Sequence, residues 1–318
     1  MTAYLVRRLL WLPVLLILIS LVTFALGVYG PGDPVTVMMG LRANPKIIEQ
    51  VRKEYGFDRP FLVQYFNYVT NAVQGNFGYS LVKYQGQPVG ALIAKRLPVT
   101  IQLNFVSILW SLPLGIALGV LAALKRGTWI DFIIRGFVIL GISLPIIGLM
   151  PVLNFAVARK HEIGPLTIGP FLPVGGWEGM FAPHIIMPAF LLGLGILAIF
   201  TRQTRAAMIE VMTSDYIRTA HAKGLKEWMV IVKHALRNAM IPLITLIGFV
   251  LAGLFAGSFI VEQFFSIPGA GALAYESLLS KDYYVILAFT LMAATIYVII
   301  NLLIDITYAF VDPRIRYK

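Results

Sequence analysis

Long apolar segments alternate with polar ones along most of the chain. Six segments approach or exceed the length of about 20 apolar residues that a membrane-spanning helix requires. They cover residues 9–29, 99–123, 136–158, 184–201, 239–261 and 284–311. The fourth is the weakest, because His184 and Pro188 lie at its start. The pattern predicts an all-α polytopic membrane protein with six transmembrane helices.

Two polar segments between these helices are long enough to fold. Residues 30–98 contain two stretches, 45–57 and 59–73, in which apolar residues recur near helical spacing. This predicts a small folded loop subdomain outside the membrane. Residues 202–238 form the second polar segment. We therefore divide the chain into a tail and first helix at 1–29, the external loop subdomain at 30–98, and a five-helix core at 99–318.

Composition and charge support the membrane assignment. The chain is 58% hydrophobic and 13% charged, which lies outside the range of soluble globular proteins. A net charge of +11 would also suit a nucleic-acid-binding protein, but the basic residues cluster at the chain ends and in loops on one side of the predicted membrane. By the positive-inside rule, that side is cytoplasmic and holds both termini, although Lys95 and Arg96 count against it. The Lys and Arg residues thus determine the orientation of the chain in the membrane. We expect membrane lipid as a partner and no nucleic acid.

Few residues in the apolar segments could perform chemistry. Asp305 is the only charged one, and its place near the end of the last segment favours a structural pair with Arg314 or Arg316. The neutral polar residues are candidates for helix packing or for a solute path; the main ones are Gln102, Asn104, Ser107, Ser143 and Asn301. Four scattered histidines and no cysteine predict no metal site, and no catalytic set is present.

The loop 202–238 is long and carries seven of the 26 basic residues. Thr213 and Ser214 are good N-cap residues, so a helix is predicted over 215–223, and Gly224 supplies the left-handed residue that ends it. A helix this short is unstable alone in water. The loop helix is therefore predicted to protrude and meet another protein, with Tyr216 and Arg218 as interface anchors.

The remainder of this loop is predicted to lie along the inner membrane surface. Trp228, Ile231, Val232, Ala235 and Leu236 would share one apolar face of a second short helix. Small residues beside the anchors of the first helix would let a partner approach closely; these are Thr219, Ala220 and Ala222. Pro242 would fall in the first turn of the next membrane helix, where its missing N–H costs little.

The segment between the last two apolar stretches, residues 262–282, allows two interpretations. Proline and glycine interrupt any helix there, and apolar side chains could enter the outer membrane face. It is either a re-entrant gate at the outer mouth of a path or a packed loop that braces two helices. The candidate gate residues are Phe264, Phe265, Pro268, Gly269 and Gly271.

The loop 202–238 resembles the cytoplasmic "EAA" loop of ABC importer permeases. When the two are aligned on Gly224, Ala220 and Leu236 match the pattern, whereas its Glu is replaced by Arg218 and its last Pro by Arg237. The runs DYIRTAHAKGL and HALRNAMIP look like the variant in the B-type permease of dipeptide, oligopeptide and nickel importers. Further runs are similar to that family in order and spacing: PGDP, YGFDRP, GNFGYS, RLPVT, GIALGVLAALKRGTWID, VEQFFSIPGAG, KDY and NLLIDITYAFVDPRIR.

The resemblance implies a permease subunit, not an enzyme, in a bacterial or archaeal cytoplasmic membrane. It would form half of a path for peptides, together with a homologous C-type permease. One or two cytoplasmic ATPases would hold ATP and Mg, because this chain has no Walker A motif, and a solute-binding protein would dock outside. The ATPase-docking coupling helix would comprise Asp215, Tyr216, Ile217, Arg218, Thr219, Ala220, His221, Ala222, Lys223 and Gly224.

Three alternatives remain open at this point. The cargo could be nickel or a metal chelate, carried by the same type of importer. The chain could also be a self-sufficient secondary transporter or channel, although the near absence of intramembrane charge argues against this. A membrane-embedded enzyme is the third alternative, and the chain offers no catalytic set for it.

Overall fold

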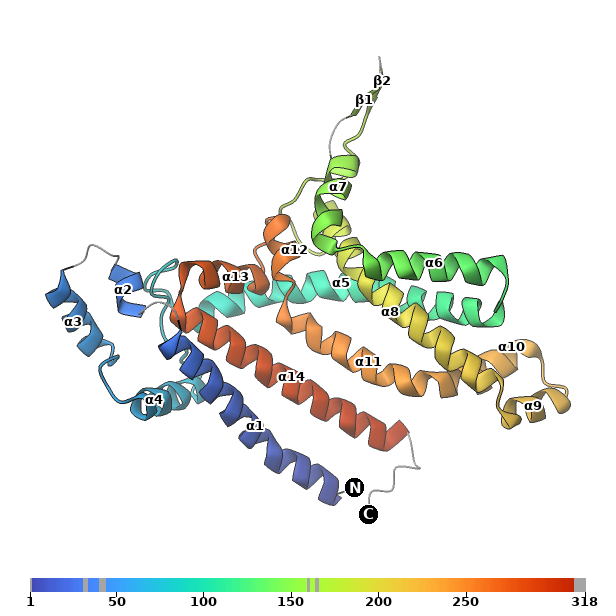
Figure 1. The fold of residues 1–318 in the computed structure, drawn as a ribbon, viewed down its shortest axis with the longest axis horizontal. Helices are drawn as coiled ribbons and strands as arrows, with labels where there is room; N and C mark the ends of the chain where they lie inside the picture. The colour runs from blue at the N-terminus through green and yellow to red at the C-terminus, as the bar shows by residue number, and fades with distance from the viewer. Residues whose placement is uncertain (1, 31–33, 40–43, 159–160, 164–165, 312–318) are drawn as a thin grey trace. The chain divides into compact units, whose positions relative to one another are not determined.

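The computed structural model describes residues 2–311, apart from 31–33, 40–43, 159–160 and 164–165 (Figure 1). The chain forms two compact units. Unit 1 comprises residues 1–100, 255–259 and 268–299, and unit 2 comprises residues 101–254, 260–267 and 300–318. We describe each unit by itself.

Five long apolar helices in the described chain can cross a membrane. They are α1 (Thr2–Tyr29), α5 (Val89–Leu124), α8 (Ile186–Met212), α11 (Arg237–Ala256) and α14 (Tyr283–Val311). A short 3-10 helix, η1 (Pro183–Ile185), leads into α8. The fourth apolar segment, the weakest in sequence, has the largest buried share of the five. These helices confirm the predicted all-α polytopic class.

The prediction of one unbroken helix over 136–158 is wrong. α6 (Trp129–Ser143) and α7 (Ile146–Ala158) are both apolar, but they are bent by 105° at the short break between them. Leu144 precedes Pro145 and is extended, with φ −78° and ψ 119°. A residue before proline avoids the α conformation, which accounts for the break. The described chain thus contains five candidate spans, or six if the bent pair counts as one.

Several predicted boundaries are also wrong. α5 begins at Val89, ten residues before the predicted start, and so includes Lys95 and Arg96. The fifth span begins much earlier than residue 239, because α10 (Glu227–Met229) and a π-helix, η2 (Val230–Leu236), run directly into α11. Pro242 consequently lies inside α11 and not in the first turn of a helix.

Unit 1 contains the three helices of the 30–98 segment, of which α4 packs against transmembrane helices. The three are α2 (Pro34–Met39), α3 (Pro45–Glu54) and α4 (Phe61–Val73). Phe24 of α1 and Tyr65 of α4 share an aromatic core with residues of α14. The Tyr65 hydroxyl lies 2.8 Å from Ser20 Oγ and donates to the Ile17 carbonyl at 3.2 Å. α4 is therefore fixed to α1 by both packing and hydrogen bonds.

A buried carboxylate anchors the loop that follows α4. Asp282 is fully buried and accepts hydrogen bonds from Ser80 Oγ at 2.5 Å and from the Leu81 and Val82 N–H groups at 3.1 and 3.2 Å. These donors supply the partners that a carboxylate needs when it is buried. Asp282 lies in the KDY run and Ser80 in the GNFGYS run, so these two distant motifs form one structure.

A second network joins the same loop to α13 (Ala270–Ser280). The Glu276 carboxylate accepts from Lys83 Nζ and from the Tyr84 hydroxyl, each at 2.8 Å, and Arg96 donates to that hydroxyl at 2.8 Å. Burial alone would raise the pKa of Glu276, but the hydrogen bonds and the charges of Lys83 and Arg96 hold it below its usual value. Thr100, in the RLPVT run, accepts from the N–H of Ala270 at 2.8 Å and so fixes the start of α13.

Unit 2 depends on close contact between α5 and α8. A side chain at Gly115 would lie 2.9 Å from the Leu197 carbonyl, and one at Gly119 would lie 2.8 Å from that of Thr201. Small residues four apart allow membrane helices to pack this closely. Unit 2 also holds the only strands of the described chain, an antiparallel hairpin of β1 (His161–Ile163) and β2 (Leu166–Ile168).

Candidate functional site

The predicted loop helix is present as α9 (Asp215–Ala222). Ser214 occupies the N-cap position with φ −76° and ψ 152°, but its hydroxyl donates to the Val211 carbonyl at 2.6 Å instead of capping α9. Gly224 has φ +72°, the left-handed conformation that glycine adopts without strain. The predicted helix, its N-cap at Ser214 and its end at Gly224 are therefore confirmed, although Ser214 makes no side-chain capping bond.

One face of α9 is buried inside unit 2. Ile217 is 1% exposed and Ala220 6%. They belong to a cluster with Met208 of α8 and with Val230 and Ala235 of η2. Burial of a large apolar side chain contributes about 1.5–3 kcal/mol. α9, which is too short to be stable alone, is therefore held on the ends of the two long helices α8 and α11.

The other face of α9 is open to solvent. The Arg218 side chain is 76% exposed, and Tyr216 is 44% exposed. Thr219, His221, Ala222 and Lys223 are also exposed. Ala220 was expected on this face and is not there, because it packs inward. The outward surface therefore offers Thr219 and Ala222 as its small residues.

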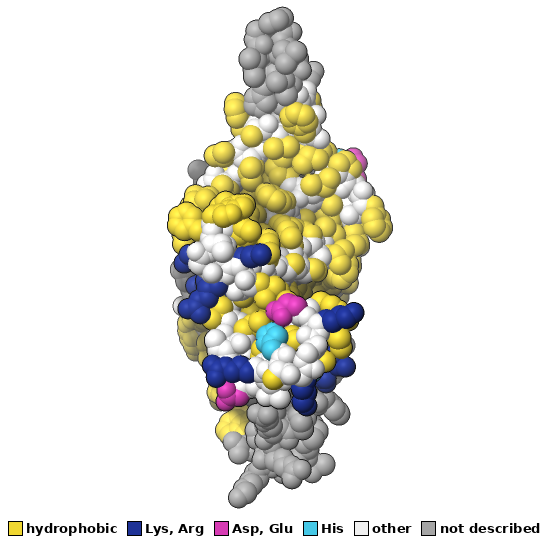
Figure 2. Space-filling model, turned by 90° about the vertical axis from the view of Figure 1, so that its right-hand side faces the viewer, with side chains coloured by type: hydrophobic (Ala, Val, Ile, Leu, Met, Phe, Trp, Pro, Cys, Tyr) yellow, Lys and Arg dark blue, Asp and Glu magenta, His cyan; other side chains and the backbone are white. Residues whose placement is uncertain are grey.

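Surface ion pairs leave this face available to a partner. Arg218 Nη1 lies 3.4 Å from the Asp215 carboxylate, and His221 Nε2 lies 3.0 Å from that of Glu227. Exposed pairs of this kind contribute little to stability, so a partner can displace them at low cost. Figure 2, which faces the end of the molecule that carries α9, shows Lys and Arg side chains distributed around this surface.

The residues after α9 do not share one apolar face as predicted. Ala235 is fully buried, whereas Trp228 and Val232 are 62% and 54% exposed. Ile231 and Leu236 are partly buried against the cluster of α9. The π-helix η2 explains the difference, because its hydrogen bonds span one residue more than those of an α-helix and shift the spacing of side chains on a face.

The sequence interpretation missed a buried ion pair between α6 and α8. Asp131 of α6 is 1% exposed, and Arg205 of α8 donates to both of its oxygens at 2.7 and 2.9 Å. The Gly127 N–H donates to the same carboxylate at 3.1 Å, and Arg135 lies 3.4 Å from it. The pair ties α6 to the part of α8 that leads into α9. One sequence signal could have predicted this pair. Asp131 lies at the start of an apolar segment, shortly after the turn at Gly127.

The candidate path residues are not gathered in one place. Ser107 is fully buried and donates to the Leu103 carbonyl of its own helix at 2.8 Å. Asn104 donates to the Leu254 carbonyl at 3.3 Å and so links α5 to α11. Gln102 and Asn301 are half-buried, and Ser143 is exposed. A role in a solute path stays a prediction for all of them.

Two further sets of predicted residues can be placed only in part. The side chain of Asp305 lies outside the described residues.

The gate candidates are the second set. Phe265, which follows α12 (Phe259–Phe264), is 1% exposed, and its carbonyl accepts from the Gly176 N–H at 2.7 Å.

Among the remaining gate candidates, Phe264 and Pro268 are exposed, and Gly269 and Gly271 are buried. The contact of Phe265 with Gly176 favours bracing, and gating stays a prediction. No group of three or more potential metal ligands occurs among the described residues.

Comparison with known proteins covers the full chain. Residues 115–317 match the family described as binding-protein-dependent transport system inner membrane component, and residues 1–104 match the N-terminal region of such a membrane component. The chain belongs to this family. It is 38% identical over 320 residues, the full length of both chains, to the glutathione transport system permease protein GsiC of Escherichia coli (strain K12). The identity and coverage are the same for GsiC of Shigella dysenteriae serotype 1 (strain Sd197).

Membership in this family confirms the predicted resemblance. The chain is a permease subunit of an ABC importer and a multi-pass inner-membrane protein. The motifs that carried the resemblance now have structural roles. GNFGYS and KDY meet at Asp282, the paired glycines of GIALGVLAAL pack α5 on α8, and the acid of GTWID is the buried Asp131.

Proposed function

We propose that this permease forms half of a path for small peptides and is driven by cytoplasmic ATPases that bind α9. The observation that carries the choice of cargo is the full-length, 38% identity to permeases of glutathione, which is itself a tripeptide. No group of three or more potential metal ligands in the described residues favours nickel or a metal chelate as the cargo.

The coupling proposal is supported by the two-sided character of α9. Its inner face is packed on α8 and η2 through Ile217 and Ala220, and its outer face presents Tyr216 and Arg218 to solvent. Tyrosine and arginine are among the residues enriched at the energetic centre of protein interfaces. A force applied to the outer face by an ATPase would pass to α8 and α11, because the cluster that holds Ile217 and Ala220 includes residues of both helices.

The partners follow from the same proposal. This subunit would pair with a homologous C-type permease, bind one or two ATPase subunits that carry ATP and Mg, and receive its cargo from a solute-binding protein. Both termini and α9 would face the cytoplasm, as the positive-inside rule indicates. The external loop subdomain, predicted over residues 30–98, would face outward.

Uptake by the reconstituted complex tests the proposal. The two permeases and their ATPases are placed in liposomes with the binding protein, and entry of radiolabelled glutathione, dipeptides and a nickel chelate is measured with ATP or with a non-hydrolysable analogue. We expect ATP-dependent entry of the peptides. Entry of the nickel chelate alone, or peptide entry that needs no ATP, would contradict the proposed function.

A further inference from the structure

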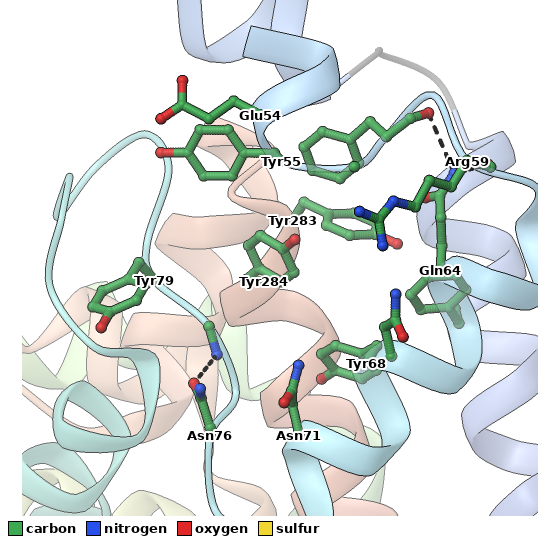
Figure 3. Close-up of a pocket in the computed structure, with 15 residues that line it drawn as sticks. Glu54, Tyr55, Arg59, Gln64, Tyr68, Asn71, Asn76, Tyr79, Tyr283 and Tyr284 are labelled. Carbon is green, nitrogen blue, oxygen red and sulfur yellow. Dashed lines mark hydrogen bonds between the residues drawn. The ribbon is translucent and has the colours of Figure 1, made fainter.

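Unit 1 contains a cavity of about 350 Å³ (Figure 3). Its wall is formed by the turn after α3, by α4, by the loop after α4 and by the start of α14. The wall is rich in carboxamide and phenol groups, such as those of Asn67, Asn71, Tyr68 and Tyr283. A cavity of this size lies at the small end of the range for small-molecule sites.

Two phenol groups on this wall lack hydrogen-bond partners. Tyr68 and Tyr283 are 8% and 5% exposed, and neither hydroxyl has a partner among the described residues. Tyr65, one turn earlier on α4, shows the contrast, because its hydroxyl is bonded to Ser20 and Ile17. Leaving a buried hydroxyl without a hydrogen-bond partner costs free energy. Such a group in a native structure indicates that a partner, such as a ligand or a water molecule, binds there.

The turn beside the cavity is held in a defined shape. The Gln64 carboxamide donates to the Phe57 carbonyl at 3.2 Å and to the Arg59 carbonyl at 2.7 Å. Gly56 at the start of the turn has φ +69°. These bonds fix the backbone of the turn, and the exposed Arg59 side chain lines the cavity. The backbone on this side of the site is therefore preformed.

Opposite charges border the cavity. Glu54 and Arg59 both line it, and Figure 3 shows them on either side of the aromatic rings at its centre. A ligand that suits this arrangement carries one positive and one negative group, separated by a section that can bond to carboxamides and phenols. A short peptide with free ends has this pattern of groups.

We propose that this cavity binds a zwitterionic di- or tripeptide, with its carboxylate at Arg59 and its ammonium group at Glu54. The amide groups of the peptide would bond to the phenols of Tyr68 and Tyr283 and to the carboxamides of Asn67 and Asn71. The choice of a peptide rests on the proposed function. The volume restricts the ligand to a few residues.

Binding of alanylalanine to the purified full chain in lipid nanodiscs, measured by calorimetry without ATPase or binding protein, tests this inference. We expect N-acetylation or C-amidation of the dipeptide to weaken binding about tenfold each, as expected for the loss of a hydrogen bond to a charged group. Arg59→Gln should weaken binding of the free dipeptide about tenfold and abolish the preference over the amidated form.

Two tyrosine variants on α4 separate ligand binding from stability. Tyr68→Phe removes a hydroxyl without a partner, so it should weaken dipeptide binding and leave the melting temperature of the free chain unchanged or higher. Tyr65→Phe removes a bonded hydroxyl outside the cavity, so it should lower the melting temperature and leave the affinity unchanged.

Two results would overturn the inference: unchanged affinity in both Arg59→Gln and Tyr68→Phe, or binding of a saccharide such as maltose with no binding of the dipeptide. Failure of ATP-driven uptake with intact dipeptide binding would refute the proposed function and not this site.

Discussion

Replacement of Gly224 by valine should uncouple transport from ATP hydrolysis. Gly224 has φ +72°, and a side chain added there would meet nothing within 4 Å. The cost of the substitution is therefore backbone strain and not a clash. An L-residue in the left-handed conformation costs about 1–2 kcal/mol, and a β-branched residue is a marked outlier there.

This strain is large enough to matter because little holds α9 in place. The inward face of the eight-residue helix buries one large side chain, Ile217, together with Ala220. Burial of Ile217 contributes about 1.5–3 kcal/mol, which is comparable to the strain. A loss of about 2 kcal/mol lowers the ratio of docked to displaced α9 by a factor of about 30. The outer face would then no longer be presented rigidly to a partner.

The assay is ATP-driven peptide uptake by the reconstituted complex, normalised to the amount of permease in the membrane. Gly224→Asn is the matched control, because asparagine tolerates the left-handed conformation. Gly136→Val adds the same side chain to α6 at an open position that does not need a positive φ. Both controls should retain uptake while Gly224→Val loses most of it. Wild-type uptake by Gly224→Val at normal permease levels would refute the reasoning.

Three further predictions concern the buried and partly buried carboxylates. Arg205→Leu should destabilise the permease by about 3–5 kcal/mol, seen as a lower melting temperature in detergent, because it leaves the Asp131 charge without its main partner; an Asp131→Asn, Arg205→Leu double variant should recover part of that loss. Asp282→Ala leaves several donors near Ser80 unsatisfied, so protease cleavage in the 79–84 loop should increase, and unchanged cleavage would argue against the anchor. The pKa of Glu276 is lowered by folding, so its contribution is complete above its ordinary value of about 4.3 and is lost as pH falls through the lower, folded pKa; Glu276→Gln should flatten this acid-side loss of stability, and an identical pH profile would contradict it.

The positions of the apolar helices could be predicted from sequence because the membrane requires long apolar runs. The ends of the helices could not, since the periodic pattern continues past the apolar run. α5 extends back to Val89 through charged residues, and α11 is preceded by a π-helix that no local pattern signals. The break before Pro145 was visible in sequence as an X-Pro pair but was outweighed by the apolar run around it.

The candidate site shows the same division between local and tertiary information. Gly224 and the length of α9 follow from local turn and helix chemistry, and both were predicted. The inward orientation of Ala220 depends on where α8 and η2 lie, which requires the tertiary fold. Asp131 and Arg205 are 74 residues apart in sequence, so their bond could not be read from spacing. The cavity beside Tyr68 and Tyr283 likewise joins segments that are distant in the chain.

Site-directed cross-linking is the most direct test of the claim that α9 couples this permease to an ATPase. The natural chain has no cysteine, so single-cysteine variants report one position each. Cysteines at Arg218 and Ala222, on the outer face of α9, should cross-link to an ATPase subunit of the assembled complex, and the yield should change when ATP is added. A cysteine at Ala220, on the inner face, should not. Equal yields at all three positions, or no cross-link at the outer ones, would contradict the account.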